Sequence, residues 1–372
     1  MIYLDNAATT QMFEGGVDIY KKYACQSFFN PSAGYSQSIE IAKELNVARD
    51  KILNKLGASK GNIIFTGGAT ESNNLAIMGS KRNGKWEYVF SVGEHPSVYN
   101  VARELESQGY TVHFVGLQEN GQIDYNQLEK VLNSKTRLIS VMHSSNETGA
   151  INDLRLVDKI RKDKSPQALL HVDGVQAFCK LEYRIDDYNI DLYTISAHKF
   201  HGPKGVGALY VRNCASLKNI VFGGGQENGY RSGTENVPGI MSMVYAIENI
   251  DVRQNYMHVK ELNKKLKEIF SKDENISYVN GNNPYVISFG FAGVNGETLM
   301  RALENESIIV GTGSACSAKK AGNRILENCG LSKDKVKTHI RISFDFNQTI
   351  DQIEEAGEII LKTYHNLLEK VK

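Results

Sequence analysis

The sequence is poor in cysteine, proline and tryptophan and carries almost no net charge. Its five cysteines are odd in number and irregularly spaced, which excludes a disulfide framework, and no Cys-x-x-Cys pair suggests a metal site. A formal net charge of +1 gives no electrostatic reason to expect a nucleic-acid or membrane partner. No apolar run is long enough to cross a bilayer, and the N-terminus MIYLDNAATT lacks the features of a signal peptide. We therefore expect a cytoplasmic protein with reduced thiols.

The first two thirds of the chain consist of short β-rich runs separated by stretches with helical spacing. The runs lie at residues 62–67, 88–92, 111–116, 137–143, 169–173, 192–196 and 206–211. Strands that alternate with helices predict an α/β fold with a mostly parallel sheet, here of seven strands, covered on both faces. A hydrophobic fraction of 41% and a charged fraction of 23% are typical of a globular protein of this kind.

The pattern changes after residue 240. A long amphipathic helix is followed by alternating strand-like and helical segments, at residues 255–270, 285–293, 297–307, 340–344 and 350–372. We predict a large α/β domain over residues 15–247. A smaller α+β domain would combine residues 1–14 with 248–372 and carry a mobile loop around Cys316.

Lys199 is the first candidate for chemistry. It lies in SAHKFHGPKG (196–205), directly after a strand-like run, where ligands bind in open α/β sheets. Lysine forms Schiff bases with carbonyl cofactors once its amine has lost a proton. By itself, a lysine is far more often an ordinary surface residue. His198 and His201 are also compatible with a metal pair, but no carboxylate or thiol nearby completes a coordination shell.

Two further motifs could complete a cofactor site. Asp173 ends the strand-like LLHVD, where a carboxylate could keep the pyridine nitrogen of pyridoxal phosphate (PLP) protonated, and Gln176 follows within reach of the ring. For Asp173 alone, an N-cap of the next helix is the slightly favoured interpretation. In FTGGATESNN (65–74), a helix that begins at Ala69 and Thr70 after two glycines predicts a phosphate site. A plain glycine turn has the same pattern.

His95 and Cys316 are the remaining candidates. His95, in GEHPSV (93–98), follows a strand and could stack on a cofactor ring, although a solitary histidine is more often structural. Cys316 lies among small residues in GTGSAC (311–316), and Lys319 and Lys320 could lower its thiol pKa, as in reactive cysteines. A small apolar residue in a loop is an equally good interpretation of Cys316.

Taken together, these motifs resemble the cysteine desulfurases, which are fold type I PLP enzymes of the class V aminotransferase group. The resemblance covers nearly the whole chain, and its motifs occur in the family's order. They are YLDNAATT (3–10), NPSAGYS (30–36), FTGGATESNN, GEHPSV, NETG (146–149), HVDGVQ (171–176), SAHKFHGPKG, GGGQENGYRSGTEN (223–236), GTGSAC and IRIS (340–343).

The resemblance implies a role for each candidate in cofactor binding. Lys199 would bind PLP covalently and then act as acid and base at the substrate Cα. Asp173 would pair with the pyridine nitrogen, His95 would stack on the ring, and Gln176 and Asn146 would contact the side of its phenolic oxygen. The phosphate would be held by four residues of one subunit and one residue of its partner in a homodimer, namely Ala69, Thr70, Ser196, His198 and the partner's Thr234.

The resemblance also implies the reaction. Arg341, with Asn146, would bind the carboxylate of L-cysteine, and the bidentate guanidinium suits that group. L-cysteine would become L-alanine while Cys316 takes the sulfur as a persulfide, as a thiolate attacks a disulfide. The acceptor would be an iron–sulfur scaffold or a transfer-RNA thiolation enzyme. Because the chain stops soon after its last expected helix, we favour a dedicated sulfur donor, for example in transfer-RNA thiolation.

Other readings of the same motifs are weaker. Selenocysteine lyase or an aminotransferase on the same fold is the nearest alternative, and a transaminase has no need of Cys316. A non-catalytic protein of this fold is disfavoured because Lys199, Asp173 and Cys316 are all present. An NAD-type enzyme is disfavoured because FTGGATES lacks the G-x-G-x-x-G spacing.

The chain departs from the family pattern at three places. Asn228 stands where arginine is frequent, so we expect an altered cofactor or dimer contact there. The residues FDF (344–346) replace small residues after IRIS and would reshape the pocket near Arg341. Cys179 stands where glycine is common.

Overall fold

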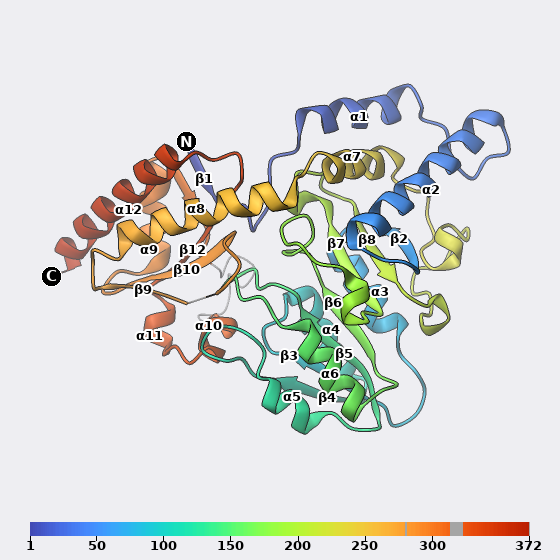
Figure 1. The fold of residues 1–372 in the computed structure, drawn as a ribbon, viewed down its shortest axis with the longest axis horizontal. Helices are drawn as coiled ribbons and strands as arrows, with labels where there is room; N and C mark the ends of the chain where they lie inside the picture. Colours follow the sequence, from blue (N-terminus) through green and yellow to red (C-terminus); the bar gives the residue numbers. More distant parts are fainter. Residues whose placement is uncertain (280, 313–322, 372) are drawn as a thin grey trace.

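The computed structural model describes residues 1–279, 281–312 and 323–371 (Figure 1). At its centre is a seven-stranded sheet in the order β2-β8-β7-β6-β5-β3-β4. β8 runs antiparallel to both of its neighbours, β2 and β7, and the other described strand pairs of this sheet are parallel, which confirms the predicted mostly parallel arrangement. The strands are β2 (Asn62–Thr66), β3 (Glu87–Ser91), β4 (Thr111–Val115), β5 (Thr136–Met142), β6 (Leu169–Asp173), β7 (Leu192–Ser196) and β8 (Gly207–Val211).

Helices cover both faces of this sheet because alternate strand residues point to opposite sides. Ile63 and Phe65 pack into a core with α2, α5, α6 and α7, whereas Ile64, between them, packs with α3 and α4 on the other face. The helices are α2 (Ser36–Leu56), α3 (Ala69–Gly79), α4 (Pro96–Ser107), α5 (Tyr125–Val131), α6 (Leu154–Lys164) and α7 (Val237–Glu248).

A separate hydrophobic core lies in the C-terminal part, drawn in orange and red in Figure 1. It is built on a three-stranded antiparallel sheet of order β12-β10-β9 and on the parallel pair β1-β11. These strands are β1 (Ile2–Leu4), β9 (Ile276–Val279), β10 (Val286–Phe291), β11 (Ile308–Val310) and β12 (His339–Ser343). The helices that pack on them are α8 (Val252–Phe270), α9 (Gly296–Asn305) and α12 (Ile350–Val371).

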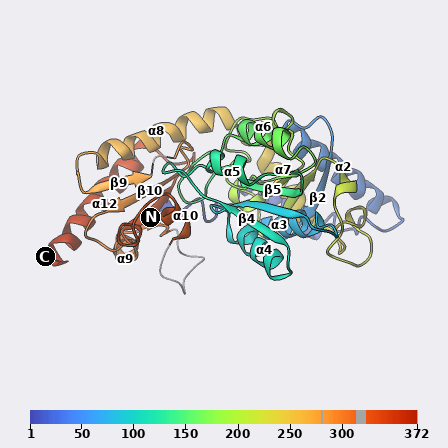
Figure 2. The ribbon, with the colours of Figure 1, turned by 90° about the horizontal axis from the view of Figure 1, so that it is seen from below.

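The first residues of the chain belong to this C-terminal core, since Ile2 and Leu4 are buried in it. α1 (Glu14–Cys25) instead packs against α7 beside the large sheet, and α8 runs from there into the C-terminal part (Figure 2). This arrangement supports the predicted division into two domains. The exact limits, with residues 15–247 in one domain and residues 1–14 and 248–372 in the other, stay a prediction.

Short elements complete the described chain. They are α10 (Arg324–Asn328), α11 (Lys333–Val336) and the 3₁₀ turns η1 (Ile185–Tyr188), η2 (Ala197–Lys199), η3 (Cys214–Ser216) and η4 (Glu227–Gly229). In the part of the chain that the structure describes, no helix is both long and apolar enough to span a membrane.

Candidate active site

A pocket of about 1370 Å³ lies at the carboxyl ends of β5, β6 and β7. The end residues of parallel strands meet at one edge of a sheet, so residues far apart in sequence line the same hollow. Ten of the predicted site residues are among its lining: Ala69, Thr70, His95, Asn146, Asp173, Gln176, Ser196, His198, Lys199 and Arg341.

Two of the predicted site residues are not in this lining. Thr234 is exposed and lies outside the pocket as formed by the described residues of one chain, so its expected contact with a partner subunit stays a prediction. Cys316 lies outside the described residues, as do Lys319 and Lys320, and its role as sulfur acceptor also stays a prediction.

Lys199 ends the short turn η2, directly after β7. Its Nζ donates hydrogen bonds to the backbone carbonyls of Ala7 and Ala8, each over 2.7 Å. The N-terminal segment therefore runs alongside the amine that lines the pocket. This contact explains structurally why residues of the C-terminal core take part in a site built on the large sheet.

Asp173 is almost completely buried at the end of β6. Its Oδ2 accepts a hydrogen bond of 2.9 Å from Asn73 Nδ2, and its Oδ1 accepts one of 3.1 Å from the Val175 backbone. The N-cap interpretation of Asp173 is wrong, because the residues that follow it form turns and not an α-helix. A buried carboxylate held by two N–H donors and lining the pocket can pair with a protonated ring nitrogen.

His95 is the N-cap of α4 and is joined to Asp173 through Ser97 and Asn73. The Ser97 backbone N–H donates to His95 Nδ1 over 3.2 Å, and Asn73 Nδ2 donates to Ser97 Oγ over 2.8 Å. Because Nδ1 accepts a hydrogen bond, the neutral ring carries its proton on Nε2. Burial lowers the pKa of His95, Asp173 opposes this shift and Lys199 adds to it. His95 is thus a neutral ring that can stack on a cofactor.

The start of α3 provides an anion site. Its N-cap is Gly68, whose φ of 145° is in the region that favours glycine, and Ala69 and Thr70 follow in the first turn. Backbone N–H groups in the first turn of a helix have no partner within the helix and attract phosphate. His198 lies on the same pocket, and burial, followed by the charge of Lys199, lowers its pKa to about 4. His198 would therefore contact a phosphate as a neutral hydrogen-bonding group.

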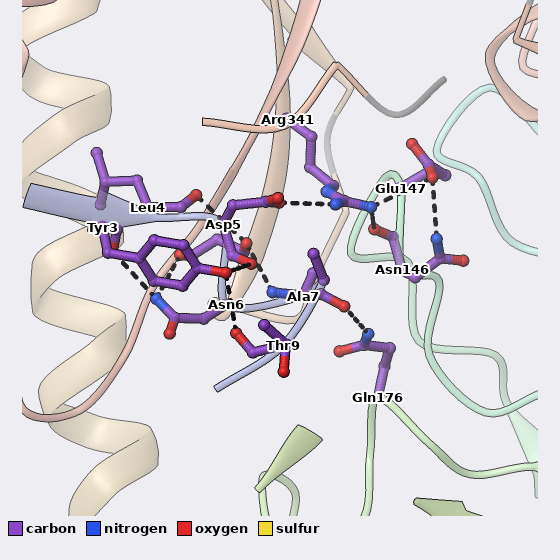
Figure 3. A network of polar contacts seen from close by, with 12 residues as sticks. Tyr3, Leu4, Asp5, Asn6, Ala7, Thr9, Asn146, Glu147, Gln176 and Arg341 are labelled. Carbon is purple, nitrogen blue, oxygen red and sulfur yellow. Dashed lines mark hydrogen bonds and ion pairs between the residues drawn. The ribbon is translucent and has the colours of Figure 1, made fainter. Parts of the chain in front are cut away.

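Arg341, on β12, meets two carboxylates in the network of Figure 3. Its guanidinium lies 2.7 Å from Asp5 Oδ1 and 3.3 Å from Glu147 Oε1, and it donates to the Asn146 carbonyl over 3.1 Å. Asn146 Nδ2 also donates to Glu147 Oε1 over 2.9 Å. Burial raises the pKa of Glu147 to about 7, although Arg341 opposes the shift. A ligand carboxylate at Arg341 would compete with these resident carboxylates.

Gln176 links the N-terminal segment at Ala7 to the buried amine of Lys180. Its Nε2 donates to the Ala7 carbonyl over 2.9 Å, which Figure 3 shows, and its Oε1 accepts a 2.9 Å hydrogen bond from Lys180 Nζ. Lys180 therefore fixes the orientation of the Gln176 amide, with Oε1 toward Lys180 and Nε2 toward Ala7.

Four residues of the site were not assigned roles from the sequence. Asn73, Asp5 and Glu147 lie inside motifs quoted above, and spacing gave a partial signal only for Asn73, which follows Ala69 by about one helical turn. Arg324 had no sequence signal. It lines the pocket, donates to the Glu94 carbonyl over 2.5 Å and lies 3.5 Å from the centre of the Tyr99 ring.

The three departures from the family pattern have distinct structural settings. Asn228 adopts a left-handed conformation with φ 54°, and its effect on a cofactor or dimer contact stays a prediction. Cys179 is buried with φ 60°, a conformation that glycine adopts more easily, and burial raises its thiol pKa to about 12. Among the described residues, none of 344–346 lines the large pocket. They line a small cavity behind Lys199 instead, and their expected effect on the pocket near Arg341 stays a prediction.

The residues of this pocket fit PLP. The Lys199 amine suits its aldehyde, Asp173 its ring nitrogen, His95 its ring and the start of α3 its phosphate. No cluster of three or more metal-ligating side chains occurs in the described ranges, so the idea of a metal site at His198 and His201 has no support there.

The chain is similar to known proteins over nearly its whole length. Residues 2–355 match the family Aminotransferase class-V. A cysteine desulfurase of Nostoc sp. is 34% identical over 369 residues, which cover 97% of this chain and 92% of the relative. A solved structure of a NifS-like protein has a TM-score of 0.91 at 30% identity, covering 97% of this chain and 98% of that chain. A structure of SspA in complex with cysteine has a TM-score of 0.83 at 31% identity, covering 94% of this chain and 100% of that chain.

These matches confirm the predicted fold, the PLP-dependent transferase fold type I. They extend over nearly the whole chain, and the family match alone covers far more than half of it. The chain belongs to the class-V aminotransferase family, whose members use PLP.

Proposed function

We propose that this protein is a cysteine desulfurase, which converts L-cysteine to L-alanine and transfers the sulfur to Cys316 as a persulfide. The observation that carries the proposal is that Lys199, Asp173 and Arg341 line one pocket. The Nostoc relative is named a cysteine desulfurase, and SspA, a structural relative, was solved with cysteine bound. Both support cysteine as the substrate.

Each residue has a defined task in this reaction. Bound PLP supplies an electron sink for the charge that develops at the substrate Cα. Asp173, held by Asn73, keeps a proton on the ring nitrogen. Lys199 holds the aldehyde carbon and then moves a proton at the substrate Cα. Arg341 binds the substrate carboxylate and so orients the amino acid.

Sulfur transfer requires a second thiol. The Cys316 thiolate attacks the substrate sulfur and forms an S–S bond while the substrate Cβ–S bond breaks. The electron pair of that broken bond stays with the carbon fragment, which gains a proton and leaves as alanine. The product on the protein is a Cys316 persulfide, whose outer sulfur passes to an acceptor protein, either an iron–sulfur scaffold or a transfer-RNA thiolation enzyme, in the cytoplasm.

The site requires a homodimer in this proposal, since Thr234 would contact the phosphate bound by the partner subunit. Its exposure at the surface supports this arrangement. So do large apolar side chains exposed on α1, on α2 and in the loops near them, which a second copy could cover. They are Val17, Tyr20, Phe28, Tyr35, Ile39 and Val47.

Mixing two inactive variants tests the shared site. If Thr234 acts across the dimer, exchange of subunits between Thr234→Ala and Lys199→Ala proteins creates one intact site per mixed dimer and restores desulfurase activity. Each variant alone should stay at its own low activity. No recovery after verified subunit exchange would place Thr234 outside the partner's site.

A single-turnover assay with L-cysteine tests the reaction itself. Wild type should release alanine and carry persulfide on Cys316, as mapped by mass spectrometry, and Cys316→Ala should do neither. Cys329→Ala is the matched control, because Cys329 is buried and its raised thiol pKa of about 11 keeps it inert. Alanine release that persists in Cys316→Ala would contradict the sulfur-transfer mechanism.

A further inference from the structure

Lys180 is a buried lysine that the reaction above does not use. Its residue is 6% exposed, although lysine is almost never buried without a paired charge. Within the described part of the chain, no carboxylate lies at ion-pair distance from its amine. Its amine faces the ring of Tyr285, 5.6 Å from the ring centre. Burial of the Lys180 amine at this position is energetically unfavourable, which suggests that the amine has a function.

The Lys180 amine is connected to Lys199 through two hydrogen-bonded groups. Lys180 Nζ donates to Gln176 Oε1 over 2.9 Å, and Gln176 Nε2 donates to the Ala7 carbonyl over 2.9 Å. Lys199 Nζ donates to the same carbonyl over 2.7 Å. The two amines thus lie on either side of one short hydrogen-bonded link, with Lys199 at the pocket and Lys180 behind it.

Both lysines also line a second, small cavity of about 10 Å³, with room for about one water molecule. This cavity lies among residues 344–346, where the family pattern has small residues. Asp345 lies there and pairs with His201 Nε2 over 3.0 Å. The charged or titratable groups that face Lys180 are Lys199, Asp345, Arg341, Cys179, His201 and Tyr285.

The electrostatic influences on Lys180 follow from this setting. Burial lowers its pKa to about 7, and the charges of Lys199 and Arg341 add to the lowering. Asp345 opposes the shift and favours the charged amine. Coupling between two titrating groups is reciprocal, so a charge on Lys180 disfavours a charge on Lys199 to the same extent.

We propose that Lys180 is a positioning residue for Lys199, because its positive charge, held behind Lys199 through Gln176, helps Lys199 to lose the proton that blocks bond formation with the PLP aldehyde. A cationic neighbour is one of the ways in which proteins activate a lysine amine. Once Lys199 is neutral, Lys180 keeps its charge more easily, and Asp345 stabilises it. The inference rests on the proposed covalent bond between Lys199 and PLP.

The test is a pH titration of the visible absorption of the PLP-loaded protein, which reports the proton on the nitrogen that links Lys199 to PLP. Lys180→Met should raise the midpoint by about one pH unit, from Coulomb repulsion at intermediate effective dielectric. Lys180→Arg keeps the charge and should restore the wild-type midpoint. Asp345→Asn removes the carboxylate that favours the charged Lys180 amine, so it should raise the midpoint, by less than Lys180→Met does.

Capture of added PLP by the cofactor-free protein gives a second readout that is independent of desulfurase activity. Its rate depends on the neutral Lys199 amine, so its pH profile should move upward in Lys180→Met. A purely structural role would reduce the stability of the fold and the occupancy of PLP, and would leave both midpoints in place.

The outcomes separate this inference from the proposed function. A folded Lys180→Met protein with a wild-type midpoint overturns the role of Lys180. If that variant does not fold, an unchanged or lowered midpoint in Asp345→Asn overturns it instead. Borohydride reduction and peptide mapping of wild type come first. If PLP is not fixed on Lys199, the proposed function fails and this inference fails with it.

Discussion

Glu147 should control how tightly the pocket holds a substrate carboxylate, because it contacts the guanidinium proposed to bind that group. The Glu147 carboxylate lies 3.3 Å from Arg341, and burial raises its pKa to about 7. Below this pKa the carboxyl is mostly protonated and neutral. Above it, the ionised carboxylate competes with the substrate for Arg341. Binding of a substrate carboxylate should therefore weaken as the pH rises through about 7.

The magnitude follows from the titration of one group. If only protonated Glu147 allows the substrate carboxylate at Arg341, the apparent Kd rises about tenfold between about pH 6 and pH 8, as expected for a group whose pKa is about 7. Glu147→Gln has no charge to lose and should flatten this dependence. At about pH 8 the variant should bind roughly tenfold more tightly than wild type. Asp5 remains a competitor in both proteins.

Calorimetric titration with L-alanine measures this effect, because alanine retains the carboxylate and has no sulfur to transfer. Comparing variant with wild type at each pH cancels the titration of the alanine amine and of Lys199. Glu327→Gln is the control, since Glu327 lines the same pocket and has no ion pair with Arg341. A Glu147→Gln protein with the wild-type pH slope would refute the competition.

Three further predictions concern the scaffold of the site. Asn73→Ala removes a donor to Asp173 and should weaken PLP binding by about 1–3 kcal/mol, measured by equilibrium dialysis; unchanged affinity would contradict it. Gly68→Ala should lower the free energy of unfolding by about 1–3 kcal/mol in urea because φ is 145°, whereas Gly34→Ala, with open space around it, should change little. Arg161→Ala breaks a buried ion pair with Asp158 and should lower the free energy of unfolding by about 3–5 kcal/mol. Arg301→Ala, at an exposed ion pair, should leave that free energy almost unchanged. Equal losses of stability in the two variants would refute this difference.

The sequence alone predicted the main sheet because most of its strands are buried on both faces. Such strands are continuous apolar runs, and each of the seven lies within about a residue of its expected bounds. β1, β9 and β11 were not predicted. They are only three or four residues long, and β9 is partly exposed, so their side chains carry almost no periodic signal.

The sequence also predicted ten of the residues that line the pocket, since glycines, Asp173 and Lys199 lie at or just after the ends of strands that share one edge. Only the tertiary structure decided what those residues contact. It places Asp5 beside Arg341 across 336 positions of sequence and seats Lys180 behind Lys199. It also turns residues 344–346 away from the large pocket toward His201. Such contacts depend on how two separate cores pack together, and short-range patterns of sequence do not encode that packing.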